Sequence, residues 1–215
     1  MHPRLYQHRR ILYVVLPLLV GLIGLGAYLC FPSLRLMAHA GQIRAIQPAQ
    51  WVDAHRYDPE WFDAARAGRV DILRALYAAH YPIDSRTSAG YTAVILAAYD
   101  SQPDALNYLL SIGADPCHGD RNGNTALMGA LYKGNVAIAR QLLGTHCPID
   151  QANNAGETAL SFAALFGRLE FLPELVAKGA DPNHVDARGN TPLAVVLKQG
   201  NEDSATALRK LSAKR

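Results

Sequence analysis

The sequence predicts an all-α protein, a solenoid of about five helix-turn-helix repeats preceded by one transmembrane helix. Two observations predict this architecture. A Gly-x-Thr motif recurs at a constant spacing of 33 residues, with its threonines at Thr92, Thr125, Thr158 and Thr191, and a fixed period of this length is typical of stacked supersecondary units. Near the N-terminus, an uncharged apolar run of 21 residues covers residues 11–31, which is long enough to cross a bilayer as a helix.

The charges around the apolar run predict its orientation. Arg4, Arg9 and Arg10 precede the run, whereas Arg35 and Arg44 follow it. Because positive residues are commoner on the cytoplasmic side of a membrane, residues 1–10 are expected to be a basic cytoplasmic tail. For a bacterial source, the chain is therefore expected to be a single-pass protein of the inner membrane with its repeats in the periplasm.

The segment that follows the apolar run leaves one alternative open. Ala38-His39-Ala40 resembles a signal-peptidase site, so removal of the run as a signal peptide is an alternative to a permanent anchor. The apolar core of a signal peptide is shorter, about 7–15 residues, and the length of residues 11–31 favours the anchor. Residues 32–56 contain Pro32 and Pro48 and no strong period, and we expect them to form a linker.

Each repeat is expected to consist of a turn followed by two short antiparallel helices. In the repeat around Thr125, Gly123 suits the positive φ of a tight turn, and the threonine hydroxyl suits the N-cap of the first helix. A polar break at residues 133–135 separates this helix from the second one, whose apolar residues recur at helical spacing: Val136, Ile138, Leu142 and Leu143. One such unit cannot bury its own apolar face, so the units must stack.

These residues resemble the ankyrin repeat family, which has a 33-residue period, a Thr-Pro-Leu-His start, a pair of alanines and a Gly-Ala-Asp-x-Asn close. The matching residues are Thr191, Pro192 and Leu193 at the start, Ala97, Ala98, Ala163 and Ala164 as pairs, and Gly113, Ala114, Asp115, Gly179, Ala180, Asp181 and Asn183 at the close. The resemblance covers roughly residues 57–211 and assigns residues 57–215 to the ankyrin repeat domain. It implies an all-α fold whose concave surface binds a protein partner.

The chain also departs from the family pattern. The family's histidine is replaced by Ile95, Met128, Ser161 or Ala194, which removes the hydrogen-bond network that it makes with the threonine. The closing segments 80–84 and 146–150 lack the family's glycine, and their turns must end differently.

The two terminal repeats are atypical. In the first repeat, Pro59 occupies the threonine position, and Asp58 is expected to be the N-cap of the helix. In the last repeat, the second helix, near residues 204–211, is rich in charged residues and is expected to be a solvent-facing cap.

We find no motif that predicts catalysis, a cofactor, a bound metal or a small-molecule substrate. The segment Asp120-x-Asn122-x-Asn124 resembles the start of a calcium loop, but Thr125 and Leu131 replace its glycine and its bidentate glutamate. The eight histidines do not cluster in the sequence, and a net charge of +3 without a basic aromatic face does not predict nucleic-acid binding.

The cysteines Cys117 and Cys147 lie at different phases of adjacent repeats. A disulfide needs Cα atoms within about 7 Å, whereas neighbouring helices pack about 8–10 Å apart. The sequence therefore predicts that these cysteines are not bonded, and an oxidising compartment is the one argument for a bond.

The resemblance to ankyrin repeats implies which residues bind the partner, because that family commonly binds proteins through its concave surface. They come from the turn tips and from the end of each first helix, and Tyr99, Tyr132 and Phe166 are expected to form an aromatic row of the kind found in interface hot spots; packing of these rings between repeats is the alternative. The full set is Tyr91, Tyr99, Asp100, Arg121, Asn122, Asn124, Tyr132, Lys133, Glu157, Leu165, Phe166, Arg188 and Lys198.

The function predicted from these features is a non-enzymatic, membrane-tethered scaffold that captures a protein partner in the periplasm. The partner is a secreted toxic effector, for which the chain would be the immunity protein, or an envelope protein. The alternative is a structural or accessory role beside an envelope or oxidative-stress enzyme, such as a catalase.

Overall fold

The computed structural model describes residues 53–212. The predicted cytoplasmic tail, the apolar run 11–31 and residues 32–52 of the predicted linker lie outside the described residues. None of the helices within 53–212 combines the length and the apolarity that a membrane span requires.

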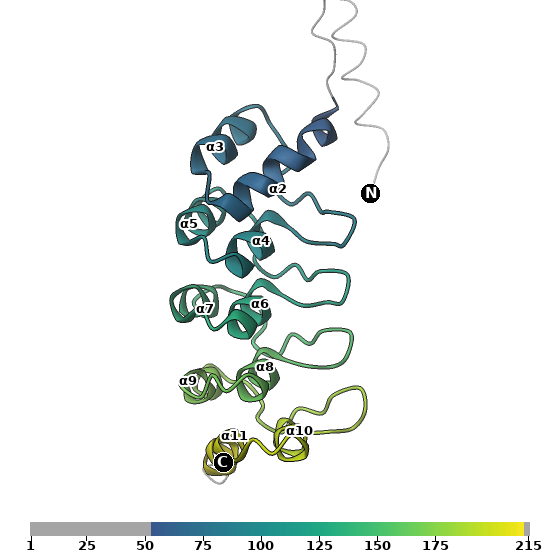
Figure 1. The fold of residues 1–215 in the computed structure, drawn as a ribbon, viewed down its shortest axis with the longest axis vertical. Coiled ribbons are helices and arrows are strands. Elements are labelled where there is room, and N and C mark those ends of the chain that lie inside the picture. Colours follow the sequence, from purple (N-terminus) through teal and green to yellow (C-terminus); the bar gives the residue numbers. More distant parts are fainter. Residues whose placement is uncertain (1–52, 213–215) are drawn as a thin grey trace, which may run out of the picture. The chain divides into compact units, whose positions relative to one another are not determined.

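The described chain is a stack of helical pairs that begins with a short 3-10 helix, η3 (Ala54–Tyr57). The first helices of the pairs form one column beside the protruding loops and the second helices form the other (Figure 1). The first column contains α2 (Asp58–Ala67), α4 (Ala93–Tyr99), α6 (Ala126–Lys133), α8 (Ala159–Leu165) and α10 (Pro192–Lys198). The second contains α3 (Val70–Ala78), α5 (Pro103–Ser111), α7 (Val136–Leu143), α9 (Phe171–Ala177) and α11 (Glu202–Ser212). The described region is therefore all-helical, as the sequence predicts.

The recurring threonines cap the first helices as expected. The N–H three residues later donates to the threonine hydroxyl at Thr92, Thr125, Thr158 and Thr191, over 3.3, 3.4, 3.3 and 3.2 Å. At Thr158 the family's missing histidine is partly replaced, because the Ser161 hydroxyl accepts from the Thr158 N–H at 3.3 Å and completes a capping box.

The first helix of the first repeat begins differently from the prediction. Tyr57 is the N-cap of α2, Asp58 is its first residue and Pro59 lies in its first turn. The prediction of Asp58 as N-cap was wrong because its carboxylate is used elsewhere: it accepts from the Tyr81 hydroxyl and lies 3.2 Å from His55 Nδ1.

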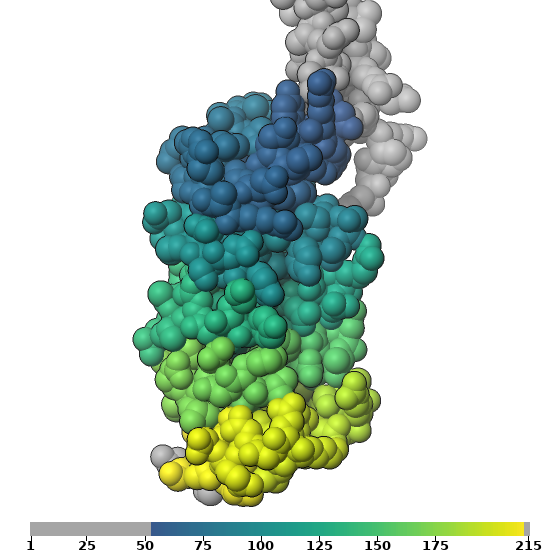
Figure 2. Space-filling view, in the orientation of Figure 1, coloured from purple at the N-terminus to yellow at the C-terminus, as the bar shows by residue number. Residues whose placement is uncertain are grey.

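Small residues allow adjacent repeats to pack closely. The paired alanines of α4 and α8 are fully buried between neighbouring first helices. These alanines are Ala97, Ala98, Ala163 and Ala164. In the space-filling view the consecutive repeats form touching bands in sequence order (Figure 2). At the C-terminal end, α11 buries Ser204, Ala205 and Leu208, and the Ser204 hydroxyl donates to the Ala164 carbonyl at 2.7 Å. This end of the stack is closed by an amphipathic helix whose other face is polar.

The closing turns adapt to the missing glycines. Gly113 and Gly179 have φ values of 88° and 100°, and His80 takes the corresponding left-handed conformation with φ 62°, which histidine tolerates better than most residues. The other glycine-free segment, around His146, has no residue at positive φ. The prediction was wrong for the turn at His80, which ends like the glycine turns because histidine can adopt the left-handed conformation. It is confirmed for the turn around His146, which ends without a left-handed residue.

Candidate partner-binding groove

The loops between repeats are tied to one another by a repeated backbone hydrogen bond. The N–H groups of Arg121, Asn154 and Ala187 donate to the carbonyls of Ala89, Asn122 and Ala155 over 2.9, 2.8 and 2.9 Å. At Gly156, whose φ is 76°, a Cβ would lie 2.6 Å from the Ala187 nitrogen. Glycine at this turn therefore permits both the conformation and the close approach of the next loop.

A groove of about 560 Å³ lies between these loops and the ends of the first helices. The loops supply Tyr91 and three polar residues, Asp120, Asn122 and Asn124, while α4, α6 and α8 supply the apolar wall. The predicted site residues that line it are Tyr91, Tyr99, Asp100, Asn122, Asn124, Tyr132 and Phe166. The structure thus brings together residues from three successive repeats.

The predicted aromatic row is continuous. The Tyr99 and Tyr132 rings stack with centroids 6.1 Å apart and an interplanar angle of 9°. The Tyr132 ring meets the Phe166 ring edge to face at 4.9 Å. The exposed fractions are 39% for Tyr99 and 45% for Tyr132, so the rings contact one another without being buried in the core.

The polar lining is partly committed to holding the loops in shape. The Asp120 carboxylate accepts from the N–H groups of Asn122 and Asn124 at 2.8 and 2.9 Å, and the Asn124 side-chain carbonyl accepts from Asn153 at 2.9 Å. These hydrogen bonds hold the turn formed by residues 120–124, whose sequence resembles the start of a calcium loop. Asp120 and Asn124 therefore act first as turn residues, and the aromatic wall is the freer part of the groove.

The remaining predicted site residues lie outside the groove lining. Lys133 stacks its ammonium 4.7 Å from the centre of the Tyr99 ring, on the edge of the row. The Arg121 guanidinium donates to the Ser88 carbonyl, and Lys198 donates to Asn190 at 2.6 Å. Glu157 and Leu165 line a separate small hollow, and the exposed Arg188 donates through its N–H to Asp186 at 2.8 Å.

Several groove residues were missed by the sequence reasoning, notably Arg66, Ile95, Gly129 and Phe162. Arg66 follows Pro59 by the same seven residues that separate Tyr99 from Thr92. Extending the frame to the first repeat, despite its missing threonine, would have found Arg66. Phe162 carries no such signal, because its position at mid-helix predicts burial.

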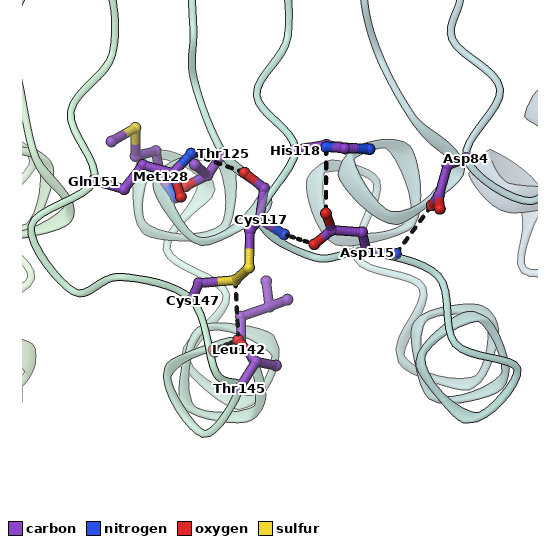
Figure 3. The surroundings of a disulfide bond; sticks show 10 residues. All are labelled: Asp84, Asp115, Cys117, His118, Thr125, Met128, Leu142, Thr145, Cys147 and Gln151. Carbon is purple, nitrogen blue, oxygen red and sulfur yellow. Dashed lines mark hydrogen bonds and ion pairs between the residues drawn. A yellow bond between two sulfur atoms is a disulfide. The ribbon is translucent and has the colours of Figure 1, made fainter. Parts of the chain in front are cut away.

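Cys117 and Cys147 form a disulfide, with Cα atoms 5.2 Å apart (Figure 3). The prediction that they are not bonded was wrong because it applied the spacing of helix axes to residues that lie on loops. The loops of adjacent repeats approach more closely: the Asp115 N–H donates to the Asp84 carboxylate at 2.9 Å and the Asp181 N–H to Asp150 at 3.0 Å, each across 31 residues. Cys117 and Cys147 are 30 residues apart and belong to the same zone of contact.

Comparison with known proteins agrees with this geometry. The family model described as ankyrin repeats (3 copies) matches residues 61–153 and 141–214. The chain belongs to the ankyrin repeat family. Ankyrin repeats are typically non-enzymatic modules of protein–protein interaction, so the ankyrin repeat chain is a protein-binding scaffold in its general character.

Relatives of this ankyrin repeat chain come from animals and bacteria. It is 30% identical over 140 residues to the ankyrin repeat and KH domain-containing protein mask-1 of Caenorhabditis elegans, covering 64% of the chain and 5% of the relative. It is 38% identical over 103 residues to protein PhlB of Serratia liquefaciens, covering 47% and 45%. Against the human SH3 and multiple ankyrin repeat domains protein 2, the identity is 28% over 164 residues, covering 73% and 9%. The chain spans less than half the length of each of these relatives.

Proposed function

We propose that this chain is a non-enzymatic scaffold, tethered to a membrane through residues 11–31, whose groove captures a protein partner outside the cytoplasm. The observation that carries the proposal is the aromatic row Tyr99–Tyr132–Phe166 on the wall of a groove of about 560 Å³. A tether would hold this groove beside the membrane surface.

The aromatic row has the properties of a binding surface. Tyrosine offers a large apolar area with few rotatable bonds and a hydroxyl that can stay hydrated, and tyrosines are enriched among the residues that dominate binding energy. Tyr99 and Tyr132 leave 39% and 45% of their surface exposed, so a partner can bury area on them without disturbing the repeat core. The Lys133 ammonium adds a charged group at the edge of the same surface.

The disulfide supports a location outside the cytoplasm. Disulfides persist in oxidising compartments such as the bacterial periplasm and are rare in the cytosol. The Cys117–Cys147 bond thus favours the same side of the membrane as the arginine distribution around residues 11–31. These two arguments are independent, because one rests on loop geometry and the other on charge.

The partner class is part of the proposal. An immunity protein anchored at the membrane would concentrate its inhibitory groove where a secreted toxic effector acts. An accessory role beside an envelope or oxidative-stress enzyme would use the same surface for a lasting contact. Tight one-to-one capture and sensitivity to the toxin after deletion distinguish the first role from the second.

The test is a crosslinking pull-down of the full-length protein from its native membranes, with the partner identified by mass spectrometry. Tyr132→Ala combined with Phe166→Ala should lower recovery of the partner at least about tenfold, because hot-spot truncations cost about 2 kcal/mol or more. Tyr57→Ala combined with Tyr77→Ala is the matched control, since these tyrosines are 41% and 42% exposed and do not line the groove.

The melting transition of each variant, followed by circular dichroism, separates lost binding from lost folding. Equal recovery of the partner by the groove variant and the control variant, with both folded, would exclude the groove as the binding site.

A further inference from the structure

We propose that the reduced chain binds a zinc ion through Cys117, Cys147, His146 and Asp115, and that formation of the disulfide releases this ion. The inference goes beyond the capture of a protein partner and does not depend on it. It rests on the side chains that the loop before α6 and the loop before α8 bring together.

The ligand atoms are already close to one another. Asp115, Cys117 and His146 each offer one atom, and these atoms lie within 4.8 Å of one another. The Cys147 sulfur is bonded to the Cys117 sulfur and supplies the fourth ligand when that bond is reduced. In a tetrahedral zinc site neighbouring ligand atoms are about 3.3–3.8 Å apart, as follows from Zn–N and Zn–S lengths of about 2.0–2.3 Å. Side-chain rotations of Asp115, Cys117 and His146, together with separation of the two sulfurs once their bond is reduced, bring the four groups to zinc distance.

The carboxylate of Asp115 is held in position by groups around it. One oxygen accepts from the Cys117 N–H at 2.8 Å, and the other lies 3.4 Å from His118 Nδ1. The Asp115 N–H donates in turn to the Asp84 carboxylate at 2.9 Å (Figure 3). Partners of this kind orient metal ligands and strengthen binding.

The loop contacts also hold the two cysteines near each other without the disulfide. Gln151 donates through its side-chain amide to the Cys117 carbonyl at 2.8 Å and joins the two loops (Figure 3). The Thr145 hydroxyl lies 3.5 Å from the Cys147 sulfur. His146 is exposed, whereas Asp115 and Cys117 are half-buried, so an ion can enter from solvent at the histidine.

The donor set selects zinc by its chemistry. Two thiolates, one imidazole and one carboxylate match the ligands and the four-coordinate geometry that Zn²⁺ prefers, whereas calcium and magnesium need oxygen ligands. In the oxidised chain the two sulfurs share a covalent bond and neither is a thiolate, so the donor set is lost.

Conversion between the disulfide-bonded chain and the zinc-bound, reduced chain conserves atoms and electrons. A dithiol reductant breaks the S–S bond by thiol–disulfide exchange, yielding two cysteine thiols and the disulfide of the reductant. Zn²⁺ then binds the two sulfurs and displaces their protons to solvent. In the reverse direction a disulfide-bearing oxidant takes two electrons from the thiolates, the Cys117–Cys147 bond forms and Zn²⁺ leaves. The two loops are thus linked in both states, by a bond or by an ion.

The experiment uses the full-length chain in detergent with Cys30→Ser, which leaves Cys117 and Cys147 as its cysteines. The zinc affinity of the reduced and the oxidised chain is measured by competition with a chromophoric chelator. Co²⁺ serves as a spectroscopic probe, because a tetrahedral thiolate site gives visible d–d bands and a sulfur-to-cobalt charge-transfer band. We expect one ion per reduced chain and none per oxidised chain.

Single substitutions test the other two ligands. His146→Asn and Asp115→Asn should each weaken zinc binding at least about tenfold, the lower end of the effect known for groups that merely support a metal ligand. His80→Asn is the matched control, because His80 occupies the equivalent place two repeats earlier, has no cysteine beside it in the sequence and adopts a left-handed conformation that asparagine tolerates. The helical circular dichroism signal and melting transition of every variant check that each is folded.

Three results would overturn the proposal. These results are no zinc binding by the reduced chain below millimolar concentration, zinc binding by the oxidised chain as tight as by the reduced chain, and zinc binding by His146→Asn as tight as by His80→Asn. The last result would remove His146 from the set of ligands.

Discussion

Replacement of the disulfide by serines, Cys117→Ser with Cys147→Ser, should lower the free energy of unfolding by about 3–4 kcal/mol. The bond closes a loop across a sequence separation of 30 residues. The chain-entropy relation gives a loss of about 12 cal/mol/K for a loop of this length, or about 3.6 kcal/mol at 25 °C. The bond acts mainly by restricting the unfolded chain, because the two loops keep hydrogen bonds of their own in the folded chain.

The assay is urea unfolding of the full-length chain in detergent, followed by the helical circular dichroism signal in the presence of a zinc chelator. With a slope of about 2–3 kcal/mol/M, the midpoint should fall by about 1–2 M urea. Cys30→Ser is the control and should unfold like the unaltered chain, because it keeps the disulfide. Thiol titration of the unfolded, oxidised chain should find one free thiol among the three cysteines.

A fall in stability below about 1 kcal/mol would refute the loop-entropy reasoning if the titration still shows one free thiol. Three free thiols would instead show that the bond does not form in the isolated protein. The two readouts separate a bond of little energetic value from a missing bond.

Two further substitutions test the loops and the first repeat. Gly156→Ala should destabilise the chain by at least about 1 kcal/mol more than Gly189→Ala. Both glycines have positive φ, which costs about 1–2 kcal/mol for alanine. Of the two, only Gly156 would place the new Cβ against a backbone atom, the Ala187 nitrogen at 2.6 Å. Equal melting temperatures of the two variants would contradict this contact. Burial and the hydrogen bond to Asp58 raise the pKa of Tyr81 well above its usual value. The contribution of Tyr81 to the free energy of unfolding is therefore complete below about pH 10 and is lost as the pH rises further. Tyr81→Phe should cost about 1 kcal/mol at neutral pH and reduce the loss of stability above pH 10, and an unchanged alkaline limb in urea unfolding would count against the assignment.

The fold could be predicted from the sequence wherever a side chain acts on its near neighbours in the chain. Thr92, Thr125, Thr158 and Thr191 recur every 33 residues because each caps a first helix, and the caps are found where the period places them. The start of the first repeat could not be predicted in the same way. The Asp58 carboxylate accepts a hydrogen bond from Tyr81, 23 residues away. A contact between residues this far apart produces no recognisable pattern in the local sequence.

The groove could be predicted in part, because its aromatic row comes from two adjacent positions of the repeat frame. Tyr99 and Tyr132 share the position seven residues after the threonine, whereas Phe166 lies eight residues after Thr158. The row continues despite this shift because the Tyr132 and Phe166 rings meet edge to face. The choice of rotamer that closes this contact depends on packing between repeats, which spacing alone cannot determine.

The disulfide could not be predicted from the repeat period, because the contact between neighbouring loops lies two to three residues off that period. The Asp84–Asp115 and Asp150–Asp181 hydrogen bonds span 31 residues and the disulfide spans 30. A pair of cysteines 33 residues apart would occupy equivalent places one repeat step apart. The offset is therefore the feature that brings the sulfurs together.

The disulfide and the aromatic row are built on the same pair of repeats. The bond joins the loop that enters α6 to the loop that enters α8, and Tyr132 and Phe166 lie at the ends of these two helices with their rings 4.9 Å apart. A covalent link between the two loops limits how far the helices can separate in the free protein, which lowers the ordering cost of binding a partner. Partner capture is therefore best measured on the oxidised chain, where the spacing of the row is restrained by the bond as well as by packing.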